Sequence, residues 1–250
     1  MLELTTLSWL VVIGTALATG LSKTSGISVM LLFVPLAASV LGAHASVGFI
    51  LPMLCMADII AVIHWRRHVL WRPLLRLLPW TFLGMAIGYY CLRRLANDHL
   101  MAVIGLVILG MVAFTFWRSW RPNPNPHVPH TWWFAALMGL LAGTTTVLAN
   151  AAGPPTVIYL LAMRLQKENF VATTAWFFWI LNLIKLPLFL HLHLITADSF
   201  RTNLALLPAI ALGALLGALL IRRIPQRPFI VIVSLLAAVA ALVLCLKGLT

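Results

Sequence analysis

Apolar runs, separated by short polar or basic breaks, follow one another along the whole chain. Runs that approach about 20 residues have the length of a helix that crosses a bilayer. The pattern predicts ten apolar helical elements and therefore an all-α integral membrane protein. The predicted elements are residues 7–21, 26–42, 44–63, 77–92, 100–117, 132–149, 153–164, 171–191, 203–221 and 228–246.

Composition supports this class. Hydrophobic residues make up 62% of the chain and charged residues only 9%, whereas a soluble domain carries about 25% charged residues. The formal net charge is +12, but the basic residues cluster in the breaks between apolar runs. Such clusters orient a membrane protein, so we expect the lipid bilayer as a partner and no nucleic acid.

The segment "RPNPNPHVPH", residues 121–130, divides the ten elements into two sets of five. Its prolines cannot continue a helix, so it is predicted to be an extended linker. The chain then consists of a first transmembrane repeat (1–120), the linker, and a second repeat (131–250). Residues 78–94 and 207–223 support a duplication, because both contain Leu-Pro, Leu-Gly, Gly and Arg-Arg at the same spacing, 129 residues apart.

The distribution of basic residues predicts how the halves are oriented. With the basic cluster at 64–76 in the cytoplasm, and a change of side at every element, twelve lysines and arginines lie inside and four outside. This agrees with the positive-inside tendency and places the linker in the cytoplasm. Five elements per half is an odd number, so the two repeats are predicted to have inverted topology.

Inverted repeats in transporters hold the substrate near the membrane midplane, on broken helices. Two polar interruptions occur at matching places, "GLSKTSG" (20–26) and "GTTTVLANAAGPP" (143–155). We expect broken or re-entrant helices there, and hydroxyl groups, helix N-termini and a lysine that bind an anion. Each hydroxyl alone also fits helix capping or close packing. The candidate binding residues are Ser22, Lys23, Thr24, Ser25, Thr144, Thr145, Thr146 and Asn150.

Two charged residues lie deep in apolar elements, Asp58 and Lys185. Charges at that depth are costly and are functional candidates. Lys185 is predicted to attract the anion, and Asn182, about one turn earlier, to add an amide donor. Asp58 is a candidate for proton coupling or for a structural ion pair. Their depths predict a separation of about 14 Å, so a direct Asp58–Lys185 pair would need a helix break, for which Pro187 is the candidate.

Four segments resemble the TauE/SafE family, also described as sulfite exporters. They are "GLSKTSG" followed by "VPL", "LLRLLPWTFLGMAIG", "TTTVLANAAGPPTVIYLLAMRL" and "AWFFWILNLIKLP". The resemblance covers nearly the whole chain and includes the duplication. It implies a multi-pass carrier in the bacterial plasma membrane that moves small oxyanions, sulfite or organosulfonates.

Together these features predict a secondary transporter, an exporter of small anions, that works by alternating access. The chain shows no nucleophile–base pair, no P-loop and no cluster of acidic metal ligands, so we expect no catalysis, no cofactor and no bound metal. The alternatives are a carrier or channel for another small solute, a membrane-embedded enzyme, and an assembly subunit. Acidic residues in the interruptions would favour a cation pathway, but the interruptions contain Lys23 and no acid.

Overall fold

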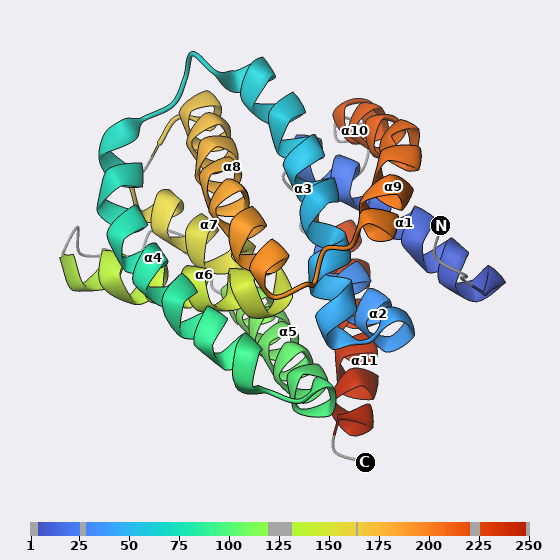
Figure 1. Cartoon of the computed structure of the whole chain (residues 1–250). Helices are drawn as coiled ribbons and strands as arrows, with labels where there is room; N and C mark the ends of the chain where they lie inside the picture. Colours follow the sequence, from blue (N-terminus) through green and yellow to red (C-terminus); the bar gives the residue numbers. More distant parts are fainter. Residues whose placement is uncertain (1–4, 26–28, 120–131, 164, 221–225, 249–250) are drawn as a thin grey trace.

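The computed structural model describes residues 5–25, 29–119, 132–163, 165–220 and 226–248. These residues form helices and no strand, which confirms the all-α prediction (Figure 1). The helices are α1 (Thr6–Ser25), α2 (Met30–Leu41), α3 (Ala43–Trp65), α4 (Trp71–Arg94), α5 (Asn97–Ser119), α6 (Trp132–Ala149), α7 (Gly153–Ala162), α8 (Lys167–His191), α9 (Ala197–Ala205), α10 (Leu207–Leu220) and α11 (Gln226–Lys247).

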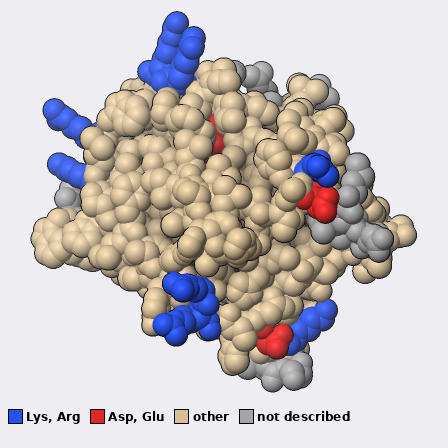
Figure 2. All heavy atoms as spheres, viewed as in Figure 1, with Lys and Arg blue, Asp and Glu red and all other residues tan. Residues whose placement is uncertain are grey.

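Several helices have the length and composition of membrane spans. Among the described residues, α1, α3, α6 and α8 meet this criterion, and the pair α9 and α10, bent by 48°, adds a fifth span if it counts as one. In Figure 2 most lysine and arginine side chains stand at the edge of the visible face, and the area between them is mostly uncharged. Large apolar side chains such as Leu83, Leu212 and Leu215 are exposed, as expected of a surface that faces lipid.

Both polar interruptions separate a long helix from a short one. α1 ends at Ser25 and α2 begins at Met30, while α6 ends at Ala149 and α7 begins at Gly153. α2 has 12 residues and α7 has 10, so at about 1.5 Å per residue each spans roughly half of the 30 Å hydrocarbon core. Each short helix can therefore begin at the level of the midplane.

Four details differ from the prediction. α1 continues to Ser25 instead of ending at residue 21, so residues 20–25 of the first predicted interruption are helical. α4 begins at Trp71 instead of residue 77, because its arginines alternate with apolar residues that face the core. α9 was not predicted; it is a polar helix whose start is fixed by a reciprocal capping box between Thr196 and Ser199. Pro187 does not break α8, which continues to His191. The linker 121–130 lies outside the described residues.

Two long helix pairs join the halves: α1 packs along α10, and α4 packs along α6. In each pair a glycine allows the backbones to touch. A Cβ at Gly20 would overlap the Ile210 carbonyl, and a Cβ at Gly143 would overlap the Thr81 carbonyl. Close approach at small residues is typical of membrane helices.

The two contacts correspond residue by residue. Gly143 follows Gly20 by 123 residues, and Ile210 follows Thr81 by 129, the offset of the repeated sequence motif. The same interface thus occurs twice, with the roles of the halves exchanged. This arrangement agrees with the duplication, and the inverted orientation of the halves stays a prediction.

Candidate functional site

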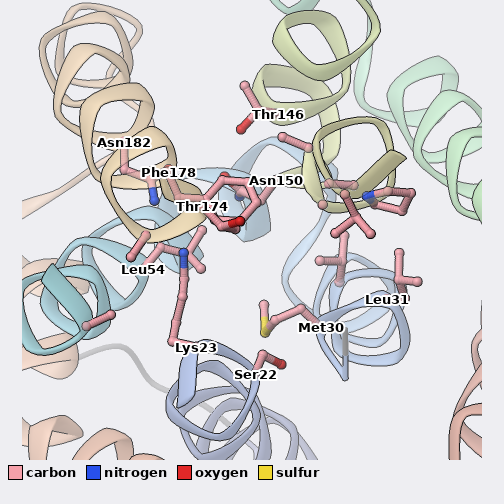
Figure 3. A pocket seen from close by; sticks show the side chains of 18 of the residues that line it. Ser22, Lys23, Met30, Leu31, Leu54, Thr146, Asn150, Thr174, Phe178 and Asn182 are labelled. Carbon is pink, nitrogen blue, oxygen red and sulfur yellow. The ribbon is translucent and has the colours of Figure 1, made fainter. Parts of the chain in front are cut away.

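A cavity of about 140 Å³ lies where the two interruptions meet (Figure 3). Its wall is formed by the end of α1, the start of α2, the junction between α6 and α7, and one face each of α3 and α8. Most of the lining side chains are apolar. The polar side chains in the wall are Ser22, Lys23, Thr146, Asn150, Thr174 and Asn182.

The short helices α2 and α7 both begin at this cavity, because Met30 and Gly153 line it. Helix N-termini carry a partial positive charge that favours an anion. The first turn of α7 offers few free N–H groups, since Pro154 and Pro155 have none. The N–H groups of Asn150 and Ala151 donate to α6 carbonyls. The start of α7 therefore contributes mainly an electrostatic field.

Lys23 and Asp58 form an ion pair beside the cavity. The Lys23 side chain lies in the last turn of α1 and is 13% exposed, whereas that of Asp58 on α3 is fully buried. Asn182 on α8 donates its Nδ2 to the second carboxylate oxygen of Asp58 at 2.5 Å. The Lys23 ammonium also lies 4.5 Å from the centroid of the Phe178 ring. Three helices thus position one lysine whose ammonium faces the cavity (Figure 3).

Lys185 is fully buried and is not part of the cavity wall. Its Nζ donates to Thr146 O at 3.2 Å, to Thr146 Oγ1 at 3.1 Å and to Asn150 Oδ1 at 2.7 Å. These three acceptors match the three donors of an ammonium. Asn150 has φ 49° and donates its own Nδ2 to Val47 O. Lys185 therefore holds the break between α6 and α7 in place.

The two lysine sites correspond between the halves. Lys185 follows Asp58 by 127 residues, and Thr146 follows Lys23 by 123, the offset that relates Gly20 to Gly143. In the first half Asp58 on α3 contacts Lys23 on α1, and in the second half Lys185 on α8 contacts Thr146 on α6. The two contacts therefore involve corresponding positions. The sequence predicts that Asp58 and Lys185 lie too far apart to pair without a helix break. In the structure Asp58 forms its ion pair with Lys23, a partner that residue spacing does not indicate.

The predicted hydroxyl groups divide into two sets. Ser22 and Thr146 line the cavity, and in the described part of the chain the Ser22 hydroxyl has no hydrogen-bond partner. Thr24 donates to Ala214 O at 2.9 Å and Thr144 to Gly84 O at 3.1 Å, which joins paired helices. Thr145 donates to Leu141 O at 2.7 Å. The Ser25 side chain lies outside the described part. The second set supports the fold, and binding roles for the first set stay a prediction.

One face of α8 was missed by the sequence analysis. Phe170, Thr174, Phe178 and Asn182 all line the cavity, and they follow one another at intervals of four residues. Residues four apart lie on one face of a helix. Counting back from Asn182 in steps of four would have found this face.

A family model described as "Sulfite exporter TauE/SafE" matches residues 10–244, nearly the whole chain. No curated protein and no solved structure gives a significant match.

Proposed function

Because the chain belongs to the TauE/SafE family of sulfite exporters, we propose that it exports small sulfur-containing anions, sulfite or organosulfonates, across the bacterial plasma membrane. The family is one of membrane transporters, and the chain is a multi-pass membrane protein. The observation that carries the proposal is the position of Lys23, whose side chain is 13% exposed and lines a cavity between two broken helices.

The cavity supplies the groups that a small oxyanion needs. The Lys23 ammonium provides a charge-assisted hydrogen bond, and the neighbouring Ser22 also lines the cavity, with a buried hydroxyl that has no partner among the described residues. Charge-assisted bonds are roughly twice as strong as neutral ones. The remaining wall is mainly apolar, which weakens the screening by water. It also gives the short carbon chain of an organosulfonate an apolar surface to contact.

Alternating access of the two halves fits the repeated interfaces between α1 and α10 and between α4 and α6. The cavity wall extends to Ala61, near the C-terminal end of α3, and to Phe170, near the N-terminal end of α8. These ends adjoin the connections that the charge distribution assigns to the cytoplasm. In this orientation the cavity faces the cytoplasm. An inside-negative potential would then favour outward movement of an anion by about 2.3 kcal/mol per charge per 100 mV.

Counterflow of radiolabelled sulfite in proteoliposomes tests this proposal. Liposomes are loaded with unlabelled sulfite, and uptake of external label is measured with sulfate, taurine or acetate as competitors. We expect saturable uptake that sulfur-containing anions inhibit more strongly than acetate. Absence of exchange with every one of these anions, from protein that remains monodisperse, would reject the proposal.

A further inference from the structure

Asp58 lies outside the cavity wall, in contact with two residues that line it, Lys23 and Asn182. Its carboxylate is fully buried and is not part of the cavity wall, yet it forms an ion pair with a lysine that is. Among the described residues, Lys23 is the one formally charged side chain in the cavity wall, and its partner Asp58 is not part of that wall. An entering anion must share Lys23 with this carboxylate or displace it.

We propose that Asp58 is a built-in counterion that takes the place of the substrate on Lys23 when the site is empty, so that the empty transporter can return to the cytoplasmic side. The proposal rests on the anion-export function above and deepens it. It distinguishes two transport activities of the same site, anion exchange and net efflux. Exchange of one anion for another never requires an empty return step, whereas net efflux requires one in every cycle.

The physical reason is the cost of an isolated buried charge. During reorientation the cavity must close on both sides, which removes water from the Lys23 ammonium. The penalty for burying an uncompensated ion is several kcal/mol. In the loaded form the bound anion shares the Lys23 ammonium with Asp58, and in the empty form Asp58 alone compensates it. Both forms can then pass through the closed state.

Asp58 has a second partner that it keeps when an anion shares Lys23 with it. The Asn182 amide holds the second carboxylate oxygen at 2.5 Å. Two further titratable residues lie about one helical turn from this pair of partners: Lys185, three residues after Asn182 on α8, and Cys55, three residues before Asp58 on α3. Lys185 itself is held by Thr146 and Asn150. Asp58 thus remains hydrogen-bonded at its second oxygen when an anion occupies Lys23.

The test compares two rates in the same proteoliposomes, namely sulfite exchange and net efflux of preloaded labelled sulfite into sulfite-free buffer, with the membrane potential clamped. For wild-type protein we expect the two rates to agree within about threefold, since the empty return is not limiting. For Asp58→Asn we expect exchange within about threefold of wild type but net efflux slowed by at least about tenfold. Asn retains the size of the side chain and removes its charge.

Asp198→Asn is the matched control, because Asp198 is an acid on the exposed side of α9 whose side chain is 53% exposed. It should change neither rate. Loss of net efflux and exchange in equal proportion in monodisperse Asp58→Asn, or no loss of either, would overturn the proposal. Wild-type protein that exchanges sulfite but shows no net efflux would overturn it without any variant. If wild-type protein moves no sulfur-containing anion in either assay, the proposed function fails instead.

Discussion

Lys185 on α8 donates a 2.7 Å hydrogen bond to the Oδ1 of Asn150, the residue with left-handed backbone between α6 and α7. Asparagine tolerates this conformation better than most residues. The same ammonium also bonds twice to Thr146 in the last turn of α6. One buried lysine therefore ties the last turn of α6 to the break that precedes α7 beside the cavity.

Lys185→Met should destabilise the protein and lower the maximal transport rate without a large change in the sulfite KM. The buried acceptors on Thr146 and Asn150 would lose their donor, at about 1–3 kcal/mol for each unsatisfied group. Thermal unfolding in detergent, combined with transport kinetics, measures both effects. Arg201→Met is the control, because this arginine is 73% exposed on the side chain. An increase in KM without loss of stability would show that Lys185 meets the substrate directly.

Lys23→Gln should differ from Lys185→Met by raising the sulfite KM. A hydrogen bond to a charged group contributes about 1.5–3 kcal/mol, which corresponds to a rise of roughly tenfold to a hundredfold. The initial rate of counterflow against sulfite concentration gives the KM. Arg201→Gln on the exposed side of α9 should leave KM unchanged. An unchanged KM for Lys23→Gln would place the anion elsewhere in the cavity.

The glycines of the paired helices should tolerate alanine very differently from a glycine with space around it. At Gly143 a Cβ would overlap the Thr81 carbonyl and lie 2.7 Å from Met85 N, and at Gly20 it would overlap Ile210. Gly143→Ala and Gly20→Ala should each destabilise the protein by about 1–3 kcal/mol or more. At Gly110 no atom lies within 4 Å of the added Cβ, so Gly110→Ala on α5 should be neutral or stabilising by up to about 1 kcal/mol. Chemical unfolding in detergent measures all three, and a clear difference between Gly20→Ala and Gly143→Ala would argue against the equivalence of the two interfaces.

The sequence predicted the class, most helices and the break between α6 and α7 because these depend on local hydrophobicity and on glycine and proline. It placed the break after α1 too early, since residues 20–25 belong to α1. It missed α9, since that helix is polar and is fixed by the capping box at Thr196. It also placed the start of α4 too late, because Arg72 and Arg76 interrupt the apolar run at the membrane edge.

The candidate site was predicted less completely, because side-chain partners depend on how helices pack. Lys23 and Asp58 were both selected, yet their ion pair joins α1 to α3 and has no signal in residue spacing. Thr24 and Thr144 have the same residue type as Thr146 but donate to neighbouring helices. Only the three-dimensional positions distinguish these threonines.

Two adjacent threonines on α8 provide a direct test of the cavity. Thr174 lines it, and its hydroxyl donates to Phe170 O at 2.7 Å within the helix. Thr173 is fully buried, and its Oγ1 accepts a hydrogen bond from Leu70 N at 3.0 Å. The two positions differ in exposure to the cavity, although both lie at the same depth in the membrane to within about 1.5 Å.

Thr174→Cys, in a background in which Cys55, Cys91 and Cys245 are replaced by alanine, should react with a membrane-impermeant anionic thiol reagent applied from the cytoplasmic side. Sulfite should slow the reaction, because it would occupy the space that the reagent enters. Thr173→Cys should stay unlabelled under the same conditions. Inside-out and right-side-out vesicles, followed by mass determination, measure the side and the extent of labelling. Labelling of Thr174→Cys from the outside alone would contradict the assignment of the basic connections to the cytoplasm. Equal labelling of both cysteines would mean that the face of α8 that carries Thr174 and Asn182 does not line the cavity.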